Sequence, residues 1–255
     1  MRKAPLVWFA IVMSVISGGL MLSAGPGQVE SISVNDGRPL AAALRAFEGL
    51  YGWIVTYEDP LYQNEGDLID VTEQVRRPGS ASKMRVLVPR GGAFSFNFER
   101  PAPDSTRTQI SDLLTAMVAE FNDAAFPGTF QVVRTEDILH VVPVSVRGRS
   151  GGPVSQQSIL ATRVSLEPMK NRNALDTIRA LLAIVQSRTG LRIEVGMVPI
   201  NLMLQSTAEE GAMDEAARDV LLRILRATGR GASWQLYYAA DFQKYVLNIH
   251  LVKSP

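Results

Sequence analysis

The sequence contains no cysteine. It therefore cannot form a disulfide, a thiol nucleophile, a cysteine-ligated zinc site or a lipidated cysteine. This does not argue against export, because exported proteins with a large enough core fold without disulfides. Histidine is nearly as rare, with only His140 and His250. Each is expected half-exposed in the last strand of its half, without partners for chemistry, so we predict no catalytic residue, no metal and no cofactor.

The chain also lacks an excess of either charge. It has 26 lysine and arginine residues and 25 aspartate and glutamate residues, which gives a formal net charge of +1. Without residues 1–24 the balance becomes 24 − 25 = −1, because Arg2 and Lys3 leave with that segment. Nucleic-acid binding requires a clustered basic face, whereas these charges are interspersed. We therefore predict no nucleic-acid partner.

One long apolar run is present, over residues 6–22. It follows a basic start and precedes small residues, which is the order of a secretory signal peptide over residues 1–25, with cleavage after Ala24 or Gly25. The run is also almost long enough to remain as an uncleaved membrane anchor. Both interpretations place the rest of the chain outside the cytoplasm, as a periplasmic or secreted protein.

Residues 37–60 carry the clearest local pattern. Pro39 suits the first turn of a helix, where its missing N–H costs nothing, and Gly52 suits the helix end. Between them, apolar side chains recur at helical spacing and predict one buried face. These side chains are Leu40, Leu44, Phe47 and Tyr51. A strand of β-branched and aromatic residues is expected next, at residues 53–57.

The rest of the chain predicts two similar units. The first, residues 28–146, adds strands at 30–34, 84–89 and 94–98, a helix that starts near residues 103–105, and a hairpin at 130–134 and 138–144. The second, residues 158–255, follows a Gly- and Ser-rich linker at 147–157. Its expected elements are strands at 159–166, 191–195 and 202–205, a helix from Asn173 to Gly190, a helix marked by apolar residues 213–225, and a hairpin at 234–238 and 245–252. This predicts an α+β fold of two tandem modules, each a mixed sheet packed by two helices in the order β-α-β-β-α-β-β.

Residues 34–40 (VNDGRPL), followed by Ala43-Leu44 and by residues 52–55 (GWIV), are similar to the opening of a known module. The order of a short strand, a polar turn, a helix, a glycine and an apolar strand resembles the short N-terminal module of secretins and TonB-dependent receptors. The resemblance covers roughly the first half of the first unit and is fainter in the second. It implies a periplasmic module that binds protein partners. No pattern of a secretin pore or an outer-membrane barrel follows, so it implies a protein that uses the module without being a transporter.

Residues 58–83, between two predicted strands of the first unit, are expected to form a long surface loop that the second unit lacks. Long loops on rigid scaffolds often carry function, so we expect this one to recognise a protein or a sugar. The candidate binding residues are Tyr57, Glu58, Asp59, Tyr62, Asp67 and Asp70. The acidic spacing matches no calcium loop. Glu58 and Asp59 are adjacent in an extended chain and should point to opposite faces, so they are a poor acid pair for glycoside hydrolysis.

These observations favour a non-catalytic, exported interaction module of the bacterial cell envelope, with an envelope protein as its partner. Membrane contact is expected only through residues 6–22, if they are not cleaved. Two alternatives stay open. One is a hydrolase that acts on cell-wall or extracellular polymer through the acidic loop, and the other is a structural subunit that assembles with copies of itself.

Overall fold

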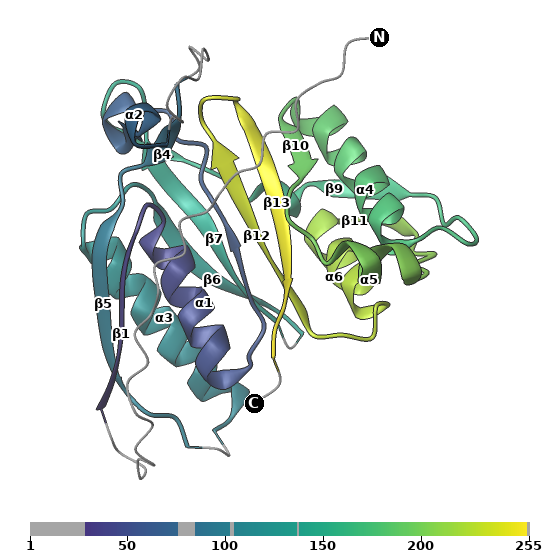
Figure 1. Ribbon diagram of the computed structural model, residues 1–255, viewed down its shortest axis with the longest axis horizontal. Helices are drawn as coiled ribbons and strands as arrows, with labels where there is room; N and C mark the ends of the chain where they lie inside the picture. The colour runs from purple at the N-terminus through teal and green to yellow at the C-terminus, as the bar shows by residue number, and fades with distance from the viewer. Residues whose placement is uncertain (1–28, 76–84, 103–104, 137, 254–255) are drawn as a thin grey trace.

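The computed structural model describes residues 29–75, 85–102, 105–136 and 138–253 (Figure 1). The fold is α+β. The predicted signal peptide or anchor lies outside the described residues, as does much of the second part of the 58–83 loop. None of the helices in the described ranges is long and apolar enough to cross a membrane.

The first half of the chain places two helices between two small sheets. The strands are β1 (Val29–Asp36), β2 (Val55–Glu58), β5 (Gly92–Glu99), β6 (Thr129–Thr135) and β7 (Ile138–Arg147), and the helices are α1 (Pro39–Tyr51) and α3 (Arg107–Asp123). β1 pairs with β5 in antiparallel fashion, β2 pairs with β7 in parallel, and β7 pairs with β6 in antiparallel fashion. Side chains from both helices and both sheets form one buried apolar cluster.

Helix α1 forms where the sequence predicts it. Pro39 occupies the first turn, and Gly52 ends the helix in the left-handed conformation with φ of 67°. The predicted face is buried at Leu40, Leu44 and Phe47. A glycine at this position avoids the steric cost that a side chain pays there.

Between β2 and β5 the described residues do not form an open loop throughout. It contains the 3-10 turn η1 (Glu65–Asp67), strand β3 (Leu68–Asp70), the short helix α2 (Thr72–Val75) and strand β4 (Leu87–Pro89). β3 and β4 pair in antiparallel fashion. The expected surface excursion is therefore partly regular structure.

The second half repeats the same order of pairings. Its elements are η2 (Ile159–Ala161), β9 (Arg163–Leu166), α4 (Ala174–Thr189), β10 (Arg192–Val195), α5 (Ile200–Gln205), β11 (Ala212–Ala216), α6 (Ala217–Arg226), β12 (Ala232–Ala239) and β13 (Lys244–Leu251). β9 pairs with β11 in antiparallel fashion, β10 with β13 in parallel, and β13 with β12 in antiparallel fashion. Each strand of the second half thus has the same partner as its counterpart in the first half.

Two local predictions in the second half are wrong. Residues 202–205, expected as a strand, belong to helix α5, and the strand comes later as β11. Met213, expected on the buried face of a helix, lies in β11 and is 86% exposed. Short apolar runs do not distinguish a strand from one turn of helix. Ile200 and Leu204, four positions apart, are both exposed whereas Met203 is buried, which is the helical pattern.

The two halves share one sheet instead of having separate ones. The strand order is β10-β13-β12-β2-β7-β6, and the joint is a parallel pairing of β12 with β2, with Gln235 opposite Tyr57 and Leu236 opposite Glu58. We call this joint the seam. Figure 1 shows α1 and α3 on one side of the molecule and α4, α5 and α6 on the other, with the yellow β12–β13 hairpin between them.

The predicted linker at residues 147–157 is also structured. Within it, β8 (Pro153–Ser155) pairs with the end of β7. The Gln156 side chain then bonds to both backbone groups of Leu61, each at 2.8 Å. These contacts fix the connection against the first half, so the two halves are not joined by a free tether.

Candidate interaction site

Asp59, the residue after β2, fastens the two halves together at the seam. Its Oδ2 lies 2.6 Å from Arg38 Nε and accepts the N–H of Tyr238 at 2.9 Å. Its Oδ1 accepts the hydroxyl of Tyr57 at 2.8 Å, and its own N–H donates to the carbonyl oxygen of Leu236 at 2.8 Å. Arg38 also donates to the Tyr238 carbonyl at 2.8 Å. The buried carboxylate thus joins a turn, a strand and the opposite half of the chain.

Five of the six predicted binding residues are buried and do not form a loop surface. The five are Tyr57, Glu58, Asp59, Tyr62 and Asp67, whereas Asp70 is exposed. Burial, followed by the nearby charge of Asp59, raises the pKa values of Tyr57 and Tyr62 well above the ordinary range. Both hydroxyls therefore stay protonated and act as donors to Asp59. The structure brings Tyr57, Asp59 and Tyr62 together as a polar core of the seam, whereas Asp67 pairs with Arg147.

Glu58 faces the other side of the sheet, as expected for a residue adjacent to Asp59. Its Oε2 accepts the hydroxyl of Ser158 at 2.7 Å and the N–H of Leu160 at 3.4 Å. Burial raises the pKa of Glu58, and the hydrogen bond from Ser158 opposes that shift. The two carboxylates have different partners on opposite faces, so they do not converge on one point.

A second buried polar group lies on the Glu58 side of the sheet. His140 is fully buried, not half-exposed as predicted, and its Nδ1 lies 2.7 Å from Thr56 Oγ1. Its ring is 5.5 Å from that of Trp234. Burial, with a smaller effect from the charge of Arg218, lowers the pKa of His140 to about 3. Within the described residues, several atoms here have no protein partner, namely Glu58 Oε1, His140 Nε2, Arg218 Nε and Nη1, and Trp234 Nε1.

The other histidine connects a helix end to the last strand. His250 Nε2 lies 2.7 Å from Glu48 Oε2, and the second oxygen of Glu48 accepts the N–H of Val55 at 3.1 Å. The second half contains the matching contact, in which Gln186 Oε1 accepts the N–H of Ile193 at 3.0 Å. In both halves the side chain precedes the strand residue by seven positions, so Ile193 corresponds to Val55.

This correspondence extends across each sheet through the strand registers. In the second half, position 195 of β10 lies opposite 247 of β13, which lies opposite 236 of β12. In the first half, position 57 of β2 lies opposite 141 of β7, which lies opposite 132 of β6. The equivalent pairs are Val195 with Tyr57, Leu247 with Val141, Leu236 with Val132, and Gln235 with Gln131. The first half uses the outer edge of β2 to hold β12, and the equivalent edge in the second half is that of β10.

Strands β10 and β6 form the two edges of the shared sheet. Among the strands in the described ranges, β10 pairs only with β13 and β6 pairs only with β7. The N–H of Gly196 donates to Leu247 of β13 at 2.8 Å, so Val195 directs its backbone groups to the outer side. An edge with outward N–H and C=O groups is a surface on which another strand can add.

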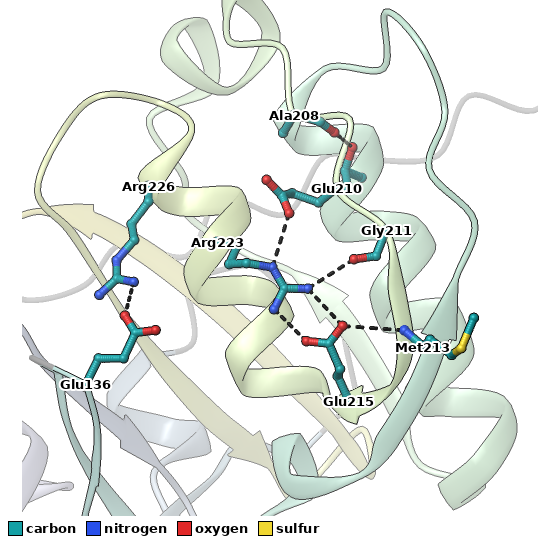
Figure 2. A network of polar contacts seen from close by, with 9 residues as sticks. Glu136, Ala208, Glu210, Gly211, Met213, Glu215, Arg223 and Arg226 are labelled. Atoms are coloured by element: carbon teal, nitrogen blue, oxygen red, sulfur yellow. Dashed lines mark hydrogen bonds and ion pairs between the residues drawn. The ribbon is translucent and has the colours of Figure 1, made fainter.

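Arg223 of α6 orders the segment that precedes this helix (Figure 2). Its guanidinium lies 2.6 Å from Glu215 and 3.2 Å from Glu210, and it donates to the Gly211 carbonyl at 3.0 Å. One helical turn later, Arg226 pairs with Glu136 at the β6–β7 turn. In Figure 2 the Arg223 contacts lie within the second half, whereas the Arg226–Glu136 pair reaches the first half.

An open groove of about 520 Å³ lies beside the β7–β8 pair. Its lining includes Asp67, Arg90 and Arg147. Arg147 pairs with Asp67, and Arg90 Nε donates to the carbonyl of Gly66 at 2.8 Å. Both cations therefore help to hold the η1 segment, and they do not converge on the groove as a ligand site would require.

No group of three or more possible metal-ligating side chains occurs within the described residues. Comparison with family models, with curated proteins and with solved structures finds no match to this chain. The sequence favours binding through an exposed sheet edge, but it does not identify β6 and β10 as the edge strands, because edge status depends on strand order. The signal that points to them is the repeated pattern itself, since it makes β10 the counterpart of the already paired β2.

Proposed function

We propose that this is an exported, non-catalytic interaction protein of the bacterial cell envelope that binds an extended segment of a partner along strand β10. The observation that carries the proposal is the strand order, in which β12 occupies the outer edge of β2 while the equivalent edge of β10 has no strand beside it in the described chain. Addition of a strand to a sheet edge gives affinity through backbone hydrogen bonds and specificity through alternate side chains.

The surface beyond the end of β10 supports this role. Met197 is 56% exposed, and on helix α5 Ile200 and Leu204 are 45% and 50% exposed. Ile200 and Leu204 are four positions apart, so both lie on the same face of α5. An apolar surface close in sequence to an open edge offers side-chain contacts in addition to the backbone pairing.

The location outside the cytoplasm rests on the apolar run at residues 6–22 and on the resemblance to periplasmic modules. Interaction is favoured over hydrolysis because the candidate acids are committed to structural contacts. Asp59 bonds Arg38 and Tyr238 at the seam, and Glu58 bonds Ser158 on the opposite face.

The test compares Val195→Pro with Val195→Ala in affinity capture from an envelope extract. Proline removes the outward N–H of an edge strand without removing a bond to β13, whereas alanine shortens the same side chain but keeps the donor. We expect Val195→Pro to lose captured partners at least tenfold and Val195→Ala to retain them, with both variants unfolding at a similar temperature. Equal capture by wild type and Val195→Pro would contradict the proposal.

A further inference from the structure

The strand order of the shared sheet contains a repeat. Replacing each second-half strand by its first-half counterpart changes β10-β13-β12-β2-β7-β6 into β2-β7-β6-β2-β7-β6. The seam is the place where the last strand of one unit meets the first strand of the next. At the two ends of the sheet, β6 is the last strand of one unit and β10 the first strand of the other, and neither has a neighbour on its outer side within the described chain.

The strand directions agree with continuation of this repeat. β12 runs parallel to β2, and β10 runs antiparallel to β12 because β10 is parallel to β13 and β13 is antiparallel to β12. β6 is likewise antiparallel to β2, because β2 is parallel to β7 and β7 is antiparallel to β6. β6 and β10 therefore run in the same direction, which is the relation that β12 and β2 have at the seam.

We infer that the partner at β10 is a second copy of this chain, whose β6 adds in parallel to β10 and so joins copies head to tail. The inference rests on the proposed function and names the occupant of the same edge. When β6 of one copy pairs with β10 of the next in the register that β12 has with β2, Gln131 lies opposite Val195 and Val132 opposite Gly196. Because the two contacting surfaces differ, a dimer still has one β6 edge and one β10 edge without a neighbour, so further copies can add.

Two side chains of the β6 edge resemble their counterparts on β12 at the seam. On β12, Gln235 points toward the first half and its Nε2 donates to the Ala41 carbonyl of α1 at 3.2 Å. The counterpart on β6 is also a glutamine, Gln131, and it is exposed. Two positions along the same face, Val133 is half-buried and takes the place of Tyr237, which packs against the first-half core. Gln131 therefore presents a polar side chain at the position of Gln235, and Val133 presents an apolar side chain at the position of the Tyr237 ring.

On each edge strand a helix side chain already bonds one outward backbone position. The stretch left for pairing with another strand is therefore about as long as the seam. The Asn122 side chain bonds both the N–H and the carbonyl of Phe130, each at 2.9 Å, and Gln186 bonds the N–H of Ile193. Val132 and Val195 are the next outward residues along β6 and β10. The seam register contains two paired positions, so a short ladder suffices where packing supports it.

The proposed contact between copies lacks the buried carboxylate that joins the two halves at the seam. The counterpart of Asp59 is Met197, and the counterpart of Tyr238 is Arg134, so no carboxylate joins the two edges. Association between copies is therefore weaker than the seam and should depend on protein concentration. The exposed Met197 side chain replaces the ionic contact with an apolar one.

The absence of cysteine permits a direct test of the register on the purified protein. Single variants Gln131→Cys and Val195→Cys are mixed and oxidised, since a disulfide forms only where the two Cα atoms come within about 4.4–6.8 Å. The matched control is Thr135→Cys mixed with Val195→Cys, because position 135 lies on the same face of β6 four residues away, roughly 13 Å along the strand. Sedimentation of the cysteine-free protein over a concentration series measures association independently.

We expect the 131–195 mixture to give at least tenfold more mixed disulfide dimer than the 135–195 mixture, and average mass to rise with concentration. Val195→Pro should abolish that rise. Equal yields from the two mixtures, a dominant 131–131 dimer, or constant monomer mass would each overturn the inference. If Val195→Pro loses captured envelope partners while the wild type stays monomeric, the proposed function stands without this partner. If Val195→Pro changes neither capture nor mass, both fail.

Discussion

A single carboxylate, that of Asp59, is bonded by groups from three parts of the chain. Its partners Arg38, Tyr57 and Tyr238 come from the turn before α1, from β2 and from β12. In water each group would be solvated, but at the seam the carboxylate is fully buried. Removal of one member of a buried ion pair is costly because the other charge stays desolvated.

Asp59→Asn should therefore destabilise the protein by about 3–5 kcal/mol, measured as the unfolding free energy in urea. Asp70→Asn is the matched control, because Asp70 pairs with Arg85 at 2.9 Å but the two side chains are 40% and 69% exposed. Exposed pairs contribute about 1 kcal/mol or less. Similar losses in the two variants would show that the seam does not depend on Asp59.

His140 should make stability fall as the solution is acidified. Burial and the charge of Arg218 lower its pKa to about 3 in the folded protein, against an ordinary value of about 6.5. Between these values the unfolded chain binds a proton that the folded chain does not, so unfolding free energy decreases as pH falls, by at most about 1.4 kcal/mol per pH unit. Glu58 acts in the opposite direction, because its raised pKa lets the folded protein take up a proton more readily.

The measurement is the change in unfolding free energy between pH 7 and pH 5 for the wild type and for His140→Gln. The wild type should lose about 2 kcal/mol more than the variant over this interval. Comparing the pH change within each protein removes the effect of the substitution itself. If both lose the same amount, the buried histidine does not account for acid sensitivity.

Residue-level features that depend on neighbours in sequence could be predicted, and those that depend on distant residues could not. Gly52 and Gly190 end their helices and Asn173 caps α4, as the local pattern indicates. The burial of Asp59 and His140 depends on Tyr238 and Trp234, which follow about one hundred to two hundred positions later. An acid before a proline normally indicates a solvated loop, and only the arrival of β12 makes it a core residue.

At the scale of elements, the two helices that precede β2 and β10 end in the same way. Each closes with a left-handed glycine, and the N–H of that glycine donates to the residue four positions earlier, at 2.8 Å from Gly52 and 2.9 Å from Gly190. The helix end then directs a side chain to the N–H of the following strand. Helix termination and strand placement are therefore one local unit in both halves.

Glycine substitutions should separate conformational strain from helix propensity. Gly190→Ala should destabilise by about 1–2 kcal/mol, because φ is 71° there and a side chain in the left-handed region is strained. Gly49→Ala, in the interior of α1, should stabilise by about 0.5–1 kcal/mol. An added Cβ meets nothing within 4 Å at either site, so crowding does not contribute. Thermal unfolding of both variants measures the contrast, and changes of the same sign would contradict it.

Helix and strand boundaries could be predicted best where the apolar period is long. The pattern from Leu175 to Val185 identifies α4, and the stripe from Ile110 to Phe121 identifies α3. The short segments α5 and β11 were predicted incorrectly because they contain too few turns or pairs to show a period. The equally short β2 and β10 were predicted, because each directly follows a glycine that ends a long helix.

At the scale of the whole molecule, the central strands are covered on both sides. All four residues of β2 are buried, and the first five of β12 are buried too. The alternating polar and apolar residues of β2 would normally indicate one solvated face. Here the polar side chains Thr56 and Glu58 meet His140 and Ser158 instead of water. The shared sheet could not be predicted from the repeat, because two similar units can equally well fold with separate sheets.

The two strands of the seam are far apart in the sequence, so they become available for pairing at different times as the chain is made. β2 is complete at Glu58, but its neighbour β12 begins only at Ala232, so a chain that emerges from its N-terminus, at the ribosome or on the far side of a membrane, completes β2 well before β12. During that interval a nascent first half has no β12 to cover β2. A finished β12–β13 hairpin from a neighbouring chain fits the uncovered strand as well as the chain's own hairpin does. Crowded production therefore favours domain-swapped dimers, and slower, dilute production favours the closed monomer.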